Sequence, residues 1–223
     1  MSIITISRMY GSGGSDVAAQ VATSLGWHLL DNALVDAVAE RLGVPVAEVE
    51  EREERVPTLV QRLAASLAMS APEILPGPST ATLPPSEERL ITVTERIIQE
   101  ACARGNVVLV GRGAQSMLAA RSDVIHAYCY APPAALAARI ALRDGISLKE
   151  AARQVEEHNN QREQYVRKHW KRSWSAFENY HLCLNTEWLG IEGAAAIVVR
   201  LARERFGAAS GPGGDDLAPR RTG

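Results

Sequence analysis

The sequence has few cysteines, little net charge and no long apolar run. Its three cysteines are widely spaced and form no Cys-x-x-Cys pair or Cys/His cluster. Neither a disulfide framework nor a structural zinc site is therefore indicated, and a reducing compartment fits. The apolar start at residues 3–6 is too short for a signal peptide, and no run approaches the roughly 20 apolar residues of a membrane-spanning helix. We expect a soluble, cytoplasmic protein with no membrane partner.

Neither sign of charge is in excess. Lys and Arg total 24 and Asp and Glu total 26, a formal net charge of −2, which argues against a broad surface for a nucleic-acid polymer but leaves room for a local basic site. Hydrophobic residues make up 46% and charged residues 22%, which excludes a disordered or fibrous protein. The 223 residues suffice for one medium α/β domain or two small ones.

Five short apolar segments alternate with helical sequence and predict five strands. They lie at residues 3–6, 27–30, 107–110, 124–130 and 182–184. Helices are expected between and after them, the longer ones over about 32–70, 86–104, 147–170 and 191–206. Strands joined by helices form parallel sheets through right-handed crossovers. The fold class predicted is therefore α/β, with a five-stranded parallel sheet covered by helices on both faces.

The same pattern predicts one domain over residues 1–206. Residues 71–86 hold five prolines and little periodicity, which is typical of a loop. The tail at 207–223 is rich in Gly, Pro, Ser, Asp and Arg, cannot bury apolar area, and is expected to be disordered.

Glycines and charged residues follow three of the predicted strands. A glycine-rich turn follows the first, Asp31 the second, and Gly111-Arg112-Gly113 the third. Ligands of parallel α/β sheets bind beyond the carboxyl ends of the strands. This placement is the first indication of a functional site.

The turn Arg8-Met9-Tyr10-Gly11-Ser12-Gly13-Gly14-Ser15 lies where a phosphate-binding loop would lie. Glycines let successive amides point at an anion, and the positive end of the following helix favours negative charge. Against the pattern GxxxxGK[ST], Gly13 and Ser15 match, whereas Arg8 replaces the first glycine and Gly14 replaces the lysine. A tight strand-to-helix turn without a ligand is the alternative. Arg8 is a candidate replacement cation, or an arginine that only pairs with a carboxylate such as Asp16.

Several segments together resemble the cytidylate kinase-like family, a branch of the P-loop nucleoside monophosphate kinases. The resemblance covers most of residues 3–200 in the expected order, and the ordered set is more specific than any one segment. The matching segments are residues 4–14, 30–35 and 108–114, Ala131-Pro132 with Arg139, residues 159–165 around Arg162, and Leu184-Asn185-Thr186.

The resemblance implies a three-layer P-loop NTPase fold and a kinase that moves the γ-phosphoryl group of ATP, with Mg²⁺, onto CMP or a related nucleoside monophosphate. It implies that the donor phosphates lie in a nest formed by Gly11, Ser12, Gly13, Gly14 and Ser15, with the Ser15 hydroxyl at the metal. Such a transfer needs positioning and cations around the phosphoryl group, and no covalent nucleophile.

Residues 139–172 form the lid that the resemblance implies. This stretch carries nine Lys and Arg residues against five Asp and Glu, a local basic excess suited to closing over phosphates. Arg139 and Arg162, with Arg8, are the candidate catalytic arginines, and Arg162 matches the lid arginine of the family. The alternative is a solvated helix with i, i+4 pairs such as Arg153–Glu157.

An acceptor-binding insert is expected over about residues 32–100. Candidate acceptor residues are Arg112 in the Gly-Arg turn, Asn159 three residues before the lid arginine, and Asp31, whose alternative role is an N-cap. Two other readings remain open: a nucleotide-binding regulatory module without turnover, and a P-loop kinase for another small hydroxylated acceptor. The long segment 32–70 suggests a homodimer contact.

The remaining histidines and tryptophans suggest structural roles. The five histidines show no spacing typical of a metal site, and His28 and His126, in predicted strands, are expected to be buried, hydrogen-bonded core residues. Trp170 and Trp174 are spaced so that they could stack on a base, although core packing is the simpler explanation.

Overall fold

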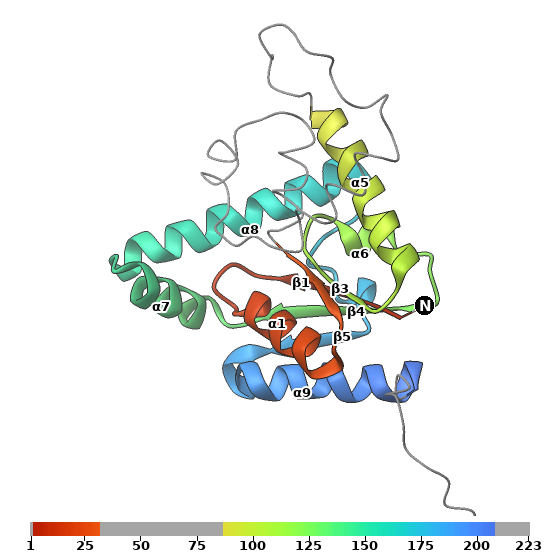
Figure 1. Cartoon of the computed structure of the whole chain (residues 1–223). Helices are drawn as coiled ribbons and strands as arrows, with labels where there is room; N and C mark the ends of the chain where they lie inside the picture. Colours follow the sequence, from red (N-terminus) through yellow and green to blue (C-terminus); the bar gives the residue numbers. More distant parts are fainter. Residues whose placement is uncertain (1, 32–86, 208–223) are drawn as a thin grey trace, which may run out of the picture.

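The structure, a computed structural model, describes residues 2–31 and 87–207 (Figure 1). Its centre is a five-stranded sheet in the order β2-β3-β1-β4-β5, with every neighbouring pair parallel. The expected α/β sheet is therefore confirmed. The strands are β1 (Ile3–Arg8), β2 (His28–Leu30), β3 (Val107–Val110), β4 (Val124–Tyr130) and β5 (Leu182–Asn185).

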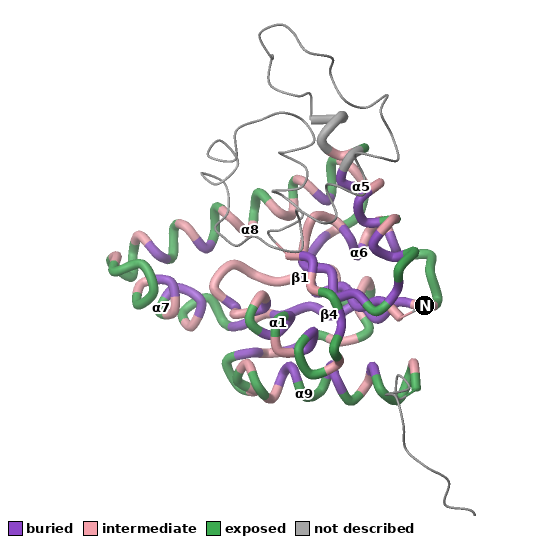
Figure 2. The backbone as a smooth tube through the Cα atoms, in the orientation of Figure 1, coloured by how far each residue is buried: buried purple, intermediate pink, exposed green. Residues whose placement is uncertain are grey.

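Each face of the sheet packs against its own pair of helices. Alternate residues of β1 point to opposite faces, so that Ile3 joins one core cluster and Ile4 the other. The first cluster is closed by α5 (Glu87–Arg104) and α6 (Ala114–Met117). The second is closed by α1 (Gly14–Leu25) and α9 (Thr186–Phe206). Figure 2 shows the buried backbone concentrated in the sheet between these layers.

A helical hairpin follows β4 and lies beyond the carboxyl ends of the strands. It consists of α7 (Pro133–Asp144) and α8 (Leu148–Trp170), and α8 runs back across the molecule toward α5 and α6 (Figure 1). The two helices bury a third apolar cluster that includes Leu136 and Val155. The hydroxyl of Ser147 accepts the amide of Glu150 at 3.2 Å and so caps the N-terminus of α8. The hairpin overlaps most of the predicted lid segment at 139–172.

The third and fourth predicted strands, over 107–110 and 124–130, are confirmed at both ends. The last helix begins at Thr186, earlier than the predicted residue 191, because the Asn185 side chain accepts the amides of Glu187 and Trp188 at 3.1 and 3.3 Å. A kink at Gly190 then redirects the chain.

The short helices α6 and Phe177–Asn179 were not predicted. Also, His28 is exposed on the edge strand β2, so its predicted burial is wrong.

Four predictions fall largely outside the described residues: the helix at 32–70 with its homodimer contact, the insert at 32–100 (apart from α5), the loop at 71–86 and the tail after residue 207. Across 2–31 and 87–207, none of the helices has the length and apolar content that crossing a membrane requires.

Candidate active site

The candidate site lies at the carboxyl ends of β1 and β3, where the chain leaves the sheet in opposite directions. After β1 the chain enters α1 on one face, and after β3 it enters α6 on the other. Such a divergence leaves an opening in which parallel α/β sheets bind ligands. The glycine loop and the Gly111-Arg112-Gly113 turn both lie here, as the sequence predicts.

The glycine loop opens onto the N-terminus of α1. Gly13 is the N-cap with φ of 73°, and no side chain caps the helix there. The first amides of α1, including those of Gly14 and Ser15, have no acceptor within their own helix and can donate to an anion. The Ser12 amide is used inside the loop, where it donates to the carbonyl of Met9 at 3.1 Å.

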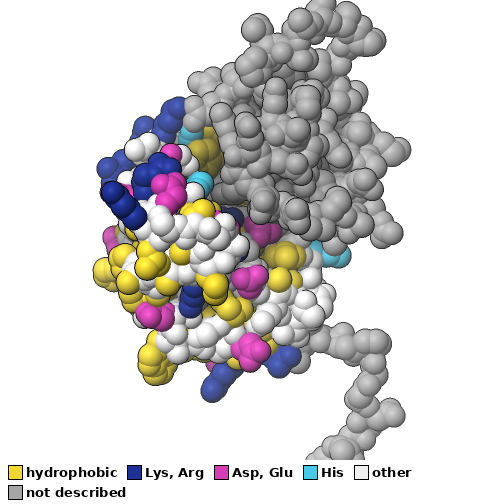
Figure 3. All heavy atoms as spheres, turned by 90° about the vertical axis from the view of Figure 1, so that its left-hand side faces the viewer, with side chains coloured by type: hydrophobic (Ala, Val, Ile, Leu, Met, Phe, Trp, Pro, Cys, Tyr) yellow, Lys and Arg dark blue, Asp and Glu magenta, His cyan; other side chains and the backbone are white. Residues whose placement is uncertain are grey.

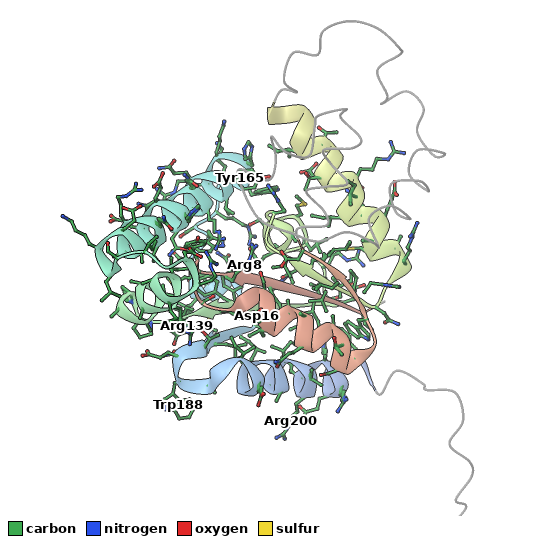
Figure 4. All side chains as sticks on the ribbon, turned by 60° about the vertical axis from the view of Figure 1, so that its left-hand side comes forward. Arg8, Asp16, Arg139, Tyr165, Trp188 and Arg200 are labelled. Carbon is green, nitrogen blue, oxygen red and sulfur yellow. The ribbon has the colours of Figure 1, made fainter. Side chains whose placement is uncertain are left out.

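Arg8 fills the space beside Gly14, where the usual phosphate-binding loop has its lysine. A Cβ on Gly14 would collide with Cβ of Arg8 and would lie 3.0 Å from its Cγ. The far end of the Arg8 side chain passes over Gly111, where a Cβ would collide with Nη1. In Figure 4, Arg8 lies between α1 and α8 in the interior of the molecule. A lysine at position 14 and this Arg8 side chain therefore exclude each other.

The Arg8 guanidinium reaches Asp31 across the end of β3. Nη2 of Arg8 lies 3.5 Å from Oδ1 of Asp31, and the two side chains are 12% and 18% exposed. Because β3 separates β1 from β2 in the sheet, the contact is possible only where Gly111 has no side chain. Asp31 is thus a carboxylate partner of Arg8, whereas the alternative reading of the sequence named Asp16 as an example.

Two arginines of the hairpin bond to carbonyl oxygens of the loop. Nη1 of Arg162 donates to the Arg8 carbonyl at 2.6 Å, and Nη1 of Arg139 donates to the Ser12 carbonyl at 3.1 Å. Arg139 also donates to the hydroxyl and the carbonyl of Thr186, at 3.1 and 2.9 Å. The structure thus brings the three arginines singled out in the sequence together at one loop.

Asn159 also bonds to the loop. Its Oδ1 accepts the amide of Tyr10 at 2.9 Å. This contact gives Asn159 a role in holding the loop, in addition to the acceptor role that the resemblance implies.

Arg112 stands in a strained turn. Gly111, Arg112 and Gly113 have φ of 70°, 50° and 71°, all left-handed, which is rare for an arginine. Its Nε is buried and has no hydrogen-bond partner within the described part of the chain. A buried donor without a partner is costly, and backbone strain concentrates at functional sites. Both observations suit a residue that waits for an anionic ligand.

Burial shifts the pKa values of two groups, one beside the site and one deeper in the sheet. Burial raises the pKa of the Cys129 thiol, which lies against Gly14, to about 12. Burial, and then the charge of His181, lowers the pKa of His126 to about 4. Because Nδ1 of the neutral His126 pairs with the Thr5 hydroxyl at 2.7 Å, His126 is a structural residue, as expected.

Other charged and aromatic residues of the hairpin have surface or core roles. Arg153 pairs with Glu150 and Glu157 at 2.7 and 3.0 Å, as the solvated-helix alternative has it. On the face that Figure 3 shows, Lys and Arg side chains gather in the upper part with acidic side chains among them. Trp174 is buried against Tyr128 in an aromatic cluster, which supports core packing.

Two residues with contacts at the site, Thr186 and the loop residue Tyr10, were missed as site residues. Thr186 donates from its hydroxyl to the Ser12 carbonyl at 2.6 Å, and Tyr10 contacts both helices of the hairpin. Both lie inside segments that carried the family resemblance, which was the available signal. Neither has a chemical type that marks it as a phosphate ligand.

Comparisons with known proteins agree with this geometry. The sequence model of the cytidylate kinase-like family matches residues 3–188. A cytidylate kinase from Ignicoccus hospitalis is 28% identical over 202 residues, which cover 90% of the chain and 99% of that protein. An uncharacterized protein from Eubacterium ventriosum has a similar structure, with a TM-score of 0.65 at 18% identity over 91% of the chain and 98% of that protein. A shikimate kinase from Bacteroides thetaiotaomicron gives 0.51 at 15% identity over 90% and 97%. The two structures show a shared fold.

Proposed function

The chain belongs to the cytidylate kinase-like family, and we propose that it transfers the γ-phosphoryl group of ATP to CMP or a related nucleoside monophosphate. The observation that carries the proposal is the position of Arg8. The carbon stem of Arg8 lies beside Gly14, in the space where a phosphate-binding loop usually holds its lysine, and its guanidinium extends past Gly111 to Asp31. The reaction class, a phosphotransferase of the nucleotide or small-molecule kinase type, follows from the family.

The donor side of the site is formed by the loop and the start of α1. Amides of residues 13–15 bind the phosphates of ATP, and Arg8 supplies the positive charge that lysine supplies elsewhere. Ser15, in the first turn of α1, is half-buried and offers a hard oxygen ligand at the phosphates, so it fits Mg²⁺. When bound, Mg²⁺ would neutralise charge on the phosphate oxygens.

The acceptor side is formed by Arg112 and Asp31. The unpaired Nε of Arg112 is suited to the phosphate of the acceptor, because an arginine binds phosphate with directed hydrogen bonds. Asp31 is bound to Arg8 and lies near the acceptor hydroxyls in this proposal. The insert at about 32–100 completes the acceptor pocket.

The hairpin α7–α8 is the proposed lid, over about residues 139–172. Its arginines hold the carbonyl oxygens of residues 8 and 12, which fixes the loop around the donor phosphates. Chemistry of this type depends on position and electrostatics, since the transferred group is loosely bonded in the transition state. Exclusion of water by the hairpin favours transfer to the nucleotide over hydrolysis of ATP.

A coupled assay that follows CDP formation from CMP and Mg-ATP tests the proposal. We expect turnover with CMP or with another nucleoside monophosphate of a panel that includes UMP and dCMP. Arg162→Ala is expected to lower kcat by about 100-fold or more, since it removes a cation from the loop. One lost charged hydrogen bond, about 1.5–3 kcal/mol, lowers Tm by only several degrees.

Arg153→Ala is the matched control, because Arg153 is an exposed arginine of the same helix that pairs only with Glu150 and Glu157 in the contacts described above. Its kcat should stay within about twofold of that of the unmodified protein. Binding of ATP without turnover of any acceptor would refute the kinase proposal and favour a regulatory nucleotide-binding module. Turnover only with a small hydroxylated metabolite would move the acceptor to another class.

A further inference from the structure

Tyr10 lies between the glycine loop and the helical hairpin. It is half-buried and contacts the apolar cluster that α7 and α8 share. Its hydroxyl accepts a hydrogen bond from Nη2 of Arg143 in α7 at 2.7 Å. Its ring packs on the ring of His158 in α8, with centroids 4.2 Å apart. One side chain of the loop therefore joins both helices.

Two guanidinium groups also face the Tyr10 ring. Cζ of Arg143 lies 5.3 Å, and Cζ of Arg162 5.9 Å, from the ring centroid, within the range of a cation–π interaction. The same Arg162 donates to the Arg8 carbonyl at 2.6 Å. The position of a proposed catalytic arginine and the position of the Tyr10 ring are thus linked by direct contact.

The backbone of the loop is held at alternate residues. Arg8 and Ser12 are held by their carbonyl oxygens, through Arg162 and Arg139, and Tyr10 is held by its amide, through Oδ1 of Asn159. Of these three residues, only Tyr10 also contributes its side chain to the hairpin contact described above. A change at this ring would shift the loop and α8 relative to each other, with no change in the phosphate-binding groups themselves.

We propose that Tyr10 is a positioning residue, which seats the glycine loop against α8 so that the donor phosphates and Arg162 keep a fixed separation. The inference rests on the proposed phosphoryl transfer. Tyr10 acts through Arg162 and the loop amides. A displacement of about 1 Å between reacting groups can reduce a rate by about 100-fold, which makes this separation a sensitive quantity.

The ring and the hydroxyl are tested by two variants. Tyr10→Leu removes the ring contacts with His158 and both arginines, and we expect kcat to fall by about 10- to 100-fold with the KM for the acceptor within about twofold. Tyr10→Phe keeps the ring and loses the bond to Arg143, and we expect a kcat within about threefold of that of the unmodified protein. Phe177→Leu, at a position 76% exposed, is the control for loss of an aromatic ring.

Hydrogen–deuterium exchange gives a readout that does not require turnover. In Tyr10→Leu we expect faster exchange both in the loop at 9–15 and in α8 around residues 156–163, with the sheet unchanged. A purely structural role would lower Tm while kcat per folded molecule and local exchange stay unchanged, and this result would overturn the proposal. Should Tyr10→Leu fail to fold, His158→Ala decides, because it removes the ring that packs on the Tyr10 ring at 4.2 Å. A fall in kcat supports the proposal, and an unchanged kcat overturns it.

Failure of the two proposals can be told apart. If the unmodified protein phosphorylates no nucleoside monophosphate, the proposed function fails, whatever Tyr10→Leu does. If the unmodified protein turns over and Tyr10→Leu retains its full kcat and the same exchange pattern, only the role of Tyr10 is refuted.

Discussion

Transplanting the usual lysine into the loop tests whether Arg8 takes its place. The double variant Arg8→Gly/Gly14→Lys converts residues 8–15 into the full GxxxxGK[ST] pattern, because Gly13 and Ser15 already match. The two single variants should each be impaired, for different reasons. We expect the double variant to be more active than the two single effects predict together.

The expected loss of stability in Gly14→Lys follows from the space around Gly14. With Arg8 present, a side chain at position 14 overlaps Cβ of Arg8 and comes within 3.0 Å of its Cγ and 3.1 Å of Cβ of Cys129. Overpacking of this kind costs about 1–3 kcal/mol, so Gly14→Lys alone should lower Tm by several degrees. Arg8→Gly alone removes a cation from the phosphates and should lower kcat/KM by about 100- to 1000-fold.

In the double variant, both contacts with Arg8 disappear, and of the three nearest atoms only Cβ of Cys129 remains, a contact that a shift of a few tenths of an ångström relieves. The lysine then restores the charge. We expect a coupling free energy of about 1–3 kcal/mol in both stability and kcat/KM, measured by urea unfolding and by the coupled assay.

Gly14→Ala, made in the unmodified protein and in Arg8→Gly, distinguishes the steric effect of a side chain at position 14 from the effect of the lysine charge. The methyl group should destabilise the protein that carries Arg8, should be tolerated after Arg8→Gly, and should restore no activity in either. If Gly14→Lys is as stable and as active as the unmodified protein while Arg8 is present, the side chain of Arg8 does not occupy the lysine position, and the reasoning is refuted.

Two further predictions concern stability. Asn185→Ala removes the side chain that accepts the amides of Glu187 and Trp188 and should cost about 1 kcal/mol in urea unfolding; an unchanged midpoint would show that the helix start at Thr186 needs no cap. Burial lowers the pKa of His126 to about 4 from 6.5, so the unfolded chain binds the extra proton first as pH falls. The stabilisation from a neutral His126, up to about 3 kcal/mol, should be complete above pH 6.5 and lost between pH 6.5 and 4. His126→Asn should flatten this part of the pH profile, whereas substitution of the exposed His28 should leave it unchanged, and equal slopes in all three proteins would contradict the assignment.

The sheet could be predicted because its strands are buried on both faces. A strand such as Val107–Val110 then consists entirely of apolar residues and stands out from its surroundings. The edge strand β2 is a counterexample, since its outer positions face solvent, and His28 lies at one of them. The four-residue helix α6 is too short for any periodicity to show.

The position of the site could be predicted from the sequence, but the hydrogen-bond and ion-pair partners of its arginines could not. Loop, turn and lid arginines were expected together, because the carboxyl ends of parallel strands meet at one edge of the sheet. Nearness in sequence favoured Asp16 as the partner of Arg8, whereas the strand order places Asp31 within reach. Sequence reasoning also missed that Arg139 and Arg162 would bond to backbone carbonyls, because the acceptors in such bonds carry no residue-specific signal.

The absence of a side chain at Gly111 determines how the donor loop and Asp31 contact each other. The Arg8 side chain runs through the gap that Gly111 leaves at the top of β3, and this gap is the passage between the donor loop and Asp31. Even a methyl group there would block the passage and break the contact between Arg8 and Asp31. The contact between the donor loop and Asp31 thus depends on a position that contributes no functional group of its own.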